Sequence, residues 1–154
     1  MSMTFAPPQT PAAPGLNAFL LQLAAVLNAA ISCLAANVAM TNANTFYDGP
    51  TITIGQPGTY LVIATLLINF TGNNVTAKIH DGTNQYAAGA GPGGVGNNYI
   101  QIPMIAFVKV QSTPLTLRAA AASTAAGNTI LSQPPANSPA NGISSCIFAM
   151  RVAQ

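Results

Sequence analysis

The stretch "PGTYLVIATLLINF", residues 57–70, constrains the fold of this chain more than any other segment. As a strand, it has one apolar face on its even positions, which are Tyr60, Val62, Ala64, Leu66, Ile68 and Phe70. Its odd positions are also largely apolar, because they include Leu61, Ile63 and Leu67. A surface strand of a small sandwich alternates apolar and polar residues, since one face meets water. We therefore expect these three side chains to be covered by a neighbouring chain or by an upstream helix.

The near absence of charge limits the partners of this protein. Charged residues make up 4% of the 154 residues, against about 25% in ordinary soluble domains. The ionisable side chains are Asp48, Asp81, Lys78, Lys109, Arg118, Arg151 and His80. A net charge of +2 on so few groups makes no basic patch, which argues against nucleic-acid binding. Little charge repulsion separates two copies, so the composition favours self-assembly.

The same composition argues against an enzyme. Acid–base catalysis uses pairs of titratable groups, and metal sites use three or four His, Cys, Asp or Glu ligands. We expect no catalytic residue, no metal and no cofactor. Gly89, Gly91 and Gly94 satisfy G-x-G-x-x-G, but no acidic residue follows them, so this motif indicates a loop. His80-Asp81 is followed by Gly82 and indicates a hairpin turn rather than a catalytic pair.

Three segments follow one another along the chain. Residues 1–15 are Pro-rich and predict an extended arm. Residues 16–41 are rich in Ala and Leu and predict an apolar helix. Its apolar stripe has an eleven-residue repeat, typical of a straight or slightly right-handed bundle. The stripe residues are Leu16, Leu20, Leu23, Leu27, Ile31, Leu34 and Val38. Residues 46–154 form the third segment, the head.

This helix has three interpretations. Its length allows a membrane span, but it contains five polar residues and has no Lys, Arg, Trp or Tyr at its ends. It could pack on its own domain, or associate with copies of itself, which is the interpretation we favour. The first 47 residues carry no charged side chain, so no secretory signal is predicted.

From residue 45 onward every signal is β. Short runs rich in Val, Ile, Thr and Tyr are separated by Gly, Pro, Asn and Asp. "VTAKIH" alternates cleanly, "DGTN" turns the chain back, and "YIQIPMIAFVKV" places its even positions on one apolar face. "LTLRA", "TILSQ" and "ISSCIFAMRV" bring the count to at least seven strands. The predicted fold is mainly β, an antiparallel jelly-roll sandwich preceded by one N-terminal α-helix.

The order of these elements over residues 46–153 resembles the tumour necrosis factor and complement globular-head jelly roll. The matching patterns are Gly58-Thr59-Tyr60 at a strand start, the hairpin from Ala77 to Gly82, the apolar pair of segments from Ile105 to Leu117, and the last strand from Ser144 to Val152. The chain departs from the family at Thr113-Pro114, where a Gly-Asp turn is common, and has no collagen repeat. The calcium and receptor residues of the family therefore do not carry over.

The resemblance implies a homotrimer in which each sandwich presents one sheet to its neighbours. An arm, a helix and a jelly-roll knob are also similar to trimeric phage head and tail attachment proteins. The expectation is a non-catalytic bacteriophage capsid decoration or fibre protein on the virion surface, assembled in the host cytoplasm. Residues 1–40 would bind the capsid or another virion protein. The expected oligomer interface comprises Leu16, Leu20, Leu23, Leu27, Ile31, Leu34, Val38, Leu61, Ile63 and Leu67.

Two other functions remain open. A receptor- or glycan-binding head, on a tail fibre or secreted, would bind through the loops at 82–98 and 133–142, which contain almost no aromatic residue for stacking. A small membrane-anchored protein is the third possibility. The two cysteines, Cys33 and Cys146, are either free buried thiols or a bridge between the helix and the sandwich.

Overall fold

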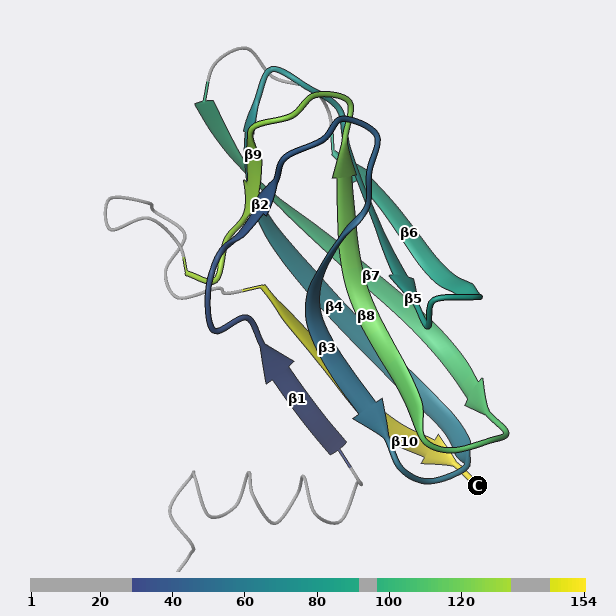
Figure 1. The fold of residues 1–154 in the computed structure, drawn as a ribbon. Helices are drawn as coiled ribbons and strands as arrows, with labels where there is room; N and C mark the ends of the chain where they lie inside the picture. Colours follow the sequence, from purple (N-terminus) through teal and green to yellow (C-terminus); the bar gives the residue numbers. More distant parts are fainter. Residues whose placement is uncertain (1–28, 92–96, 134–144) are drawn as a thin grey trace, which may run out of the picture.

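The computed structural model describes residues 29–91, 97–133 and 145–154, which form two antiparallel sheets packed face to face (Figure 1). The larger sheet has the order β1 (Ala29–Cys33), β10 (Cys146–Ala153), β4 (Gly58–Thr71), β9 (Asn128–Ile130), β2 (Val38–Met40), with β7 (Asn97–Val110) on the other side of β4. The smaller sheet has the order β3 (Tyr47–Ile54), β8 (Leu115–Ser123), β5 (Val75–His80), β6 (Gln85–Gly91). The predicted β-sandwich is therefore confirmed for these residues.

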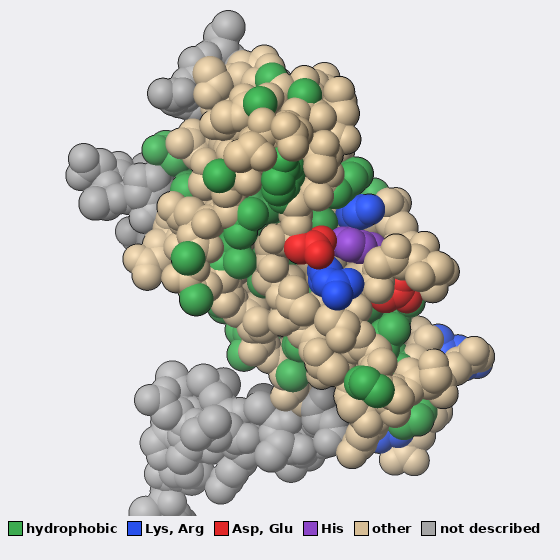
Figure 2. Space-filling model, viewed as in Figure 1, with side chains coloured by type: hydrophobic (Ala, Val, Ile, Leu, Met, Phe, Trp, Pro, Cys, Tyr) green, Lys and Arg blue, Asp and Glu red, His purple; other side chains and the backbone are tan. Residues whose placement is uncertain are grey.

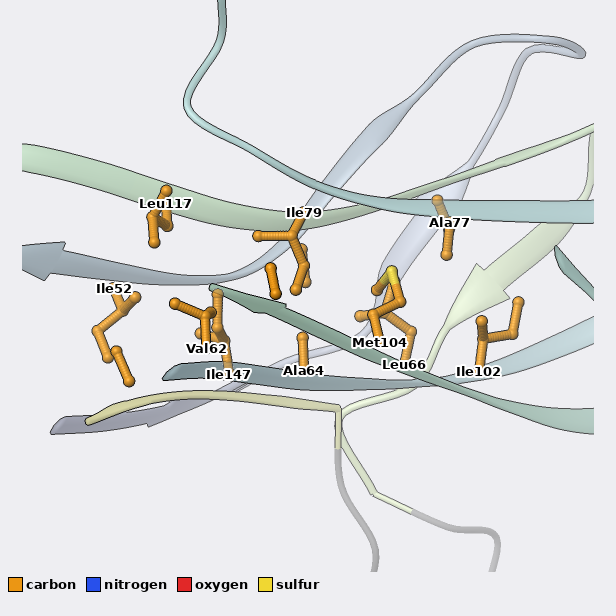
Figure 3. Close-up of a cluster of buried hydrophobic side chains, with 14 of the residues drawn as sticks. Ile52, Val62, Ala64, Leu66, Ala77, Ile79, Ile102, Met104, Leu117 and Ile147 are labelled. Atoms are coloured by element: carbon orange, nitrogen blue, oxygen red, sulfur yellow. The ribbon is translucent and has the colours of Figure 1, made fainter. Parts of the chain in front are cut away.

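The core lies between the sheets and follows the period of two in the strands. The even positions of β4 from Tyr60 to Phe70 are buried, and in β5 so are Val75, Ala77 and Ile79. β7 alternates without interruption from residue 101 to residue 110, with its even positions buried. Figure 3 shows side chains from both sheets, among them Val62, Leu66 and Ile79, meeting in this layer.

The predicted helix over residues 16–41 is wrong for its second half. Residues 29–33 and 38–40 are strands of the larger sheet, so the sandwich begins well before residue 46. The Ala-rich composition favours a helix only weakly, and tertiary packing overrides such propensities. Here the packing comes from Leu34 and Val38, which contact the core, and from Met40, which is fully buried. Leu16, Leu20, Leu23 and Leu27 lie outside the described residues, as does the arm.

The loop predicted for the motif of Gly89, Gly91 and Gly94 is also wrong in its first part, because Gly89 and Gly91 belong to β6 (Gln85–Gly91). The glycines there serve packing. A Cβ on Gly89 would lie 2.7 Å from Cγ2 of Ile102, and one on Gly91 would lie 2.0 Å from Cδ1 of Ile100. Glycine therefore allows β6 to approach β7 across the sandwich. Gly94 lies outside the described residues.

Within the described part of the chain, no helix has the length and apolar character needed to span a membrane.

Candidate functional site

The outer face of the larger sheet carries two rows of apolar side chains. Residues paired across antiparallel strands point to the same face, so the strand register defines each row. The first row is Ile31 of β1, Phe148 of β10, Ile63 of β4 and Ile105 of β7. The second row is Ala29, Met150, Leu61 and Phe107 on the same four strands. We call the seven larger side chains the apolar patch: Ile31, Leu61, Ile63, Ile105, Phe107, Phe148 and Met150.

The apolar patch is open to solvent in the single chain. Ile31 is 69% exposed, Ile105 63% and Phe107 71%, and Ile63 is 37% exposed between them. Leu61, Phe148 and Met150 are half-buried. Neither row contains a charged side chain. A contiguous apolar surface of this kind on a small protein marks an interaction site.

Three residues expected at the interface are placed elsewhere. Leu67 is only 4% exposed and belongs to the interior of the chain. The segments leaving β9 and entering β10 meet β4 at this point: Leu131 donates its N–H to the Leu67 carbonyl at 2.8 Å, and Ser145 Oγ accepts the Leu67 N–H at 2.9 Å. Leu34 and Val38 pack against the core of the same chain, so they are not available as a helix stripe.

The patch also contains residues that the sequence reasoning missed. Ile105 and Phe107 stand on the odd positions of β7, and Phe148 and Met150 lie on β10. The signal was present in the run "MIAFV", which is apolar on both faces as β4 is. Of the expected interface residues, Ile31, Leu61 and Ile63 do lie together on this face, because β10 brings β1 next to β4.

A group of charged side chains lies on the opposite surface, the outer face of the smaller sheet (Figure 2), whereas Lys109 on β7 shares the outer face of the larger sheet with Phe107. Asp48 on β3 lies 3.0 Å from Nε2 of His80 on β5 and 3.3 Å from Nε of Arg118 on β8. Lys78, also on β5, places its Nζ 4.1 Å from the centre of the Phe46 ring. The two outer faces of the sandwich therefore differ: the larger sheet carries the apolar patch with Lys109 beside it, and the smaller sheet carries the Asp48, His80 and Arg118 group.

Both ring nitrogens of His80 are engaged. Nε2 donates to Asp48 Oδ1, and Nδ1 accepts the N–H of Gly82 at 3.1 Å, which fits the tautomer with its proton on Nε2. Among the described residues, no three His, Cys, Asp or Glu side chains come together as metal ligands would. The arrangement links β5 to β3 across β8, which lies between them in the sheet.

Asp81 organises the turn of that hairpin. Its carboxylate accepts hydrogen bonds from the N–H groups of Thr83 and Asn84, from the Asn84 side chain and from the Tyr86 hydroxyl. Burial acts to raise the pKa of Asp81, but these bonds outweigh it and hold the pKa well below its usual range. Burial and the neighbouring carboxylate raise the pKa of Tyr86. The hairpin interpretation of Asp81-Gly82 is confirmed by this geometry.

A shallow groove of about 480 Å³ lies on the charged side of the molecule. Its lining consists of Phe46, Thr76, Ala77, Gln85, Ala88, Gly89 and Ala90. Phe46 is 42% exposed, and the outward positions of β6 carry only alanine there. The groove thus combines the aromatic ring of Phe46, a base of alanine and glycine residues, and the polar side chains of Thr76 and Gln85. Four of the lining residues fall in the expected binding segment 82–98, but they belong to strand β6 and not to a loop. Of the other expected loop, 133–142, residues 134–142 lie outside the described part.

Cys33 and Cys146 are joined by a disulfide with a Cα–Cα distance of 4.0 Å. Of the two alternatives, free thiols are wrong and a bridge is formed, but it links the end of β1 to the start of β10, strand to strand, and not a helix to the sandwich. The next pair along is hydrogen-bonded, since Leu34 donates its N–H to the Ser145 carbonyl at 2.9 Å. Because hydrogen-bonded and non-hydrogen-bonded pairs alternate, the cysteines form a non-hydrogen-bonded pair, where side chains are closest.

No protein-family model and no curated protein sequence matches this chain. Solved structures do match. The Eiger TNF of S. frugiperda aligns with a TM-score of 0.56 at 13% identity, over 82% of this chain and 92% of that one. The C-terminal CBM6 of LamC, a marine laminarinase from Zobellia galactanivorans, aligns with a TM-score of 0.41 at 14% identity, over 80% of this chain and 100% of that one. This chain has the tumour necrosis factor-like jelly-roll fold.

Proposed function

We propose that this protein is a non-catalytic structural protein that works as a homotrimer assembled through the apolar patch. The observation that carries the proposal is the exposure of Ile31, Ile105 and Phe107 in two rows without a charged side chain. Burying such side chains stabilises an assembly by about 25 cal/mol for each Å² of apolar surface removed from water. In a closed homo-oligomer, a second and a third copy of this chain cover the apolar patch of the first.

Two further features support three copies. The tumour necrosis factor-like fold is typically trimeric. The charged group around Asp48, His80 and Arg118 lies on the other sheet, so assembly through the apolar patch leaves these side chains in water. Desolvating charge would oppose assembly, and the Asp48, His80 and Arg118 group lies where assembly does not require its desolvation.

We assign the trimer to the surface of a virion, as a capsid decoration or fibre protein. Residues 29–40 are built into the sandwich, so attachment to another virion protein falls to residues 1–28. The disulfide between Cys33 and Cys146 supports a protein that functions in an oxidising environment, such as the outside of a released particle. A secreted protein would share this property.

The interface is tested by placing a carboxylate in the apolar patch. Phe107→Asp and Ile105→Asp should each convert a trimer to a monomer at micromolar concentration, because each charge would be buried unpaired at the interface. Ala88→Asp is the matched control, since Ala88 is exposed on β6, on the outer face of the smaller sheet. Light scattering gives the mass, and circular dichroism checks the fold. A trimer that survives both patch variants contradicts the proposed interface.

A second candidate function is ligand binding in the groove beside Phe46. An exposed aromatic ring beside Thr76 and Gln85 offers stacking and hydrogen bonding to a saccharide. Titration of the protein with oligosaccharides, followed by NMR, should then shift the resonances of Thr76 and Gln85. Phe46→Ala should abolish those shifts. Shifts that persist in this variant, or their absence from the unmodified protein, contradict the candidate.

A further inference from the structure

We propose that the Cys33–Cys146 disulfide is a redox latch that holds strand β1 in the apolar patch. When it is closed, β1 is fixed and the assembly is durable; when it is open, β1 detaches from the sheet edge and the assembly becomes labile. The part of this inference that concerns assembly rests on the proposed trimer. The part that concerns β1 does not.

The first observation is that β1 has little non-covalent support. Among the residues that the structure describes, it is the end strand of its sheet and pairs with β10 alone. None of its five residues is buried, and Ile31 is largely exposed. Edge strands without buried side chains belong to the part of a structure that opens locally at low free energy.

The second observation is a cavity of about 260 Å³ beside β1. It is lined by Ala29, Ala30, Thr53, Ile54, Gly55, Gln56, Tyr60 and Ala149. The backbone and small side chains of β1 therefore form one wall of this cavity. A well-packed strand would instead fill such a volume with side chains that contact the core. Within the described ranges, β1 lacks on that side the dispersion contacts that a filled layer would give it.

The third observation is the position of the bond. Cys33 is the last residue of β1, it is exposed, and it points to the same face as Ile31 two residues earlier. The disulfide thus lies at the border of the apolar patch and fixes the strand that supplies Ile31. With this bond closed, fraying of β1 from its C-terminal end is blocked.

Opening the latch is thiol–disulfide exchange. A dithiol reductant supplies two electrons and two protons; the S–S bond breaks, Cys33 and Cys146 become thiols, and the dithiol becomes a disulfide. The chain has two cysteines and the structure leaves neither free, so a reductant acts on this bond alone. The core strands remain, because no buried side chain belongs to β1.

Amide hydrogen exchange of the full chain, oxidised and then reduced with dithiothreitol, tests the latch directly. The amides of Ala30, Ser32 and Leu34 face β10 and should exchange at least about tenfold faster after reduction. After reduction, the amide of Val62, in the middle of β4, should stay at least about tenfold better protected than these β1 amides, because it exchanges only when the whole sandwich unfolds. Equal protection of the β1 amides in both states would overturn the latch.

The effect on assembly is tested by sedimentation, which measures the dissociation constant of the trimer. The samples are the oxidised chain, the reduced chain and the double variant Cys33→Ala/Cys146→Ala. Reduction should raise the dissociation constant of the trimer by about tenfold or more, the double variant should behave like the reduced chain, and dithiothreitol should not affect the variant. An unchanged dissociation constant with faster β1 exchange would overturn the link to assembly. If the oxidised chain is a monomer, the proposed trimer fails, and the latch is decided by the exchange data alone.

Discussion

The Asp81 carboxylate shows how one residue fixes a turn in a chain with few charges. Its depressed pKa means that the folded state favours the ionised form. A group whose folded pKa lies below its unfolded value, about 3.9 for Asp, contributes stability that is present above that value and is lost as the pH falls below it. We therefore expect acid destabilisation to begin near pH 4.

The variant Asp81→Asn tests whether the Asp81 carboxylate causes this acid destabilisation. At pH 7 the variant should lose about 1–3 kcal/mol of unfolding free energy, because the hydrogen bonds would no longer be made to a charged acceptor. Between pH 5 and pH 3 the unmodified protein should lose more stability than the variant. Urea unfolding at each pH measures both. Parallel pH profiles for the two proteins would show that Asp81 does not contribute.

At the same scale, the sequence revealed part of the apolar patch. Leu61 and Ile63 were recognised because they make a strand apolar on both faces. Leu67 follows the same pattern but is buried, because the contacts with Leu131 and Ser145 come from segments distant in sequence. Periodicity identifies a face; it does not identify what another part of the chain places over it.

Among the strands, β3 contains a glycine, Gly49, that has no room for a side chain. A Cβ on Gly49 would lie 2.9 Å from the carbonyl oxygen of Ala119 and 3.2 Å from Leu66. Gly55, just after the same strand, has nothing within 4 Å of that position. These two glycines form a matched pair for testing how tightly β3 packs on the sandwich.

Gly49→Ala should destabilise the protein by about 1–3 kcal/mol, since a backbone atom must move. Gly55→Ala should leave stability unchanged or raise it by up to about 1 kcal/mol through the unfolded state. Thermal unfolding of the two variants beside the unmodified chain makes the comparison. Equal effects of the two substitutions would contradict the packing of β3 described above.

The elements also show where prediction from sequence succeeded and failed. The strands from residue 47 onward carry alternation and turn residues that act locally, so β4, β5, β7 and the Asp81 turn were predictable. Residues 29–40 were not, because Ala, Leu, Ile and Val at spacings of three and four satisfy a helix pattern. The partners that make β1 and β2 strands, β10 and β9, lie about 90 to 120 residues away.

For the whole molecule, the disulfide joins the first and last described strands across 113 residues. In the chain-entropy model, closing a loop of this length stabilises the folded state by about 5 kcal/mol. Cys33→Ala/Cys146→Ala should therefore unfold at a clearly lower denaturant concentration than the oxidised protein. Guanidinium titration with and without dithiothreitol gives the difference. A loss below about 1 kcal/mol would contradict this contribution.

The contrast between the two outer faces is also a property of the whole molecule. One sheet presents exposed isoleucine and phenylalanine, and the other presents the Asp48, His80 and Arg118 group. The separation of the two kinds of surface favours assembly, because a closed oligomer can bury the apolar patch and keep the charged group in water.

The mass of the oxidised full chain in solution decides whether the apolar patch assembles into a trimer. Light scattering at micromolar concentration should give one species of three times the 15.6 kDa chain mass. A monodisperse species of 15.6 kDa would mean that the apolar patch remains in water, and would contradict the proposed trimer.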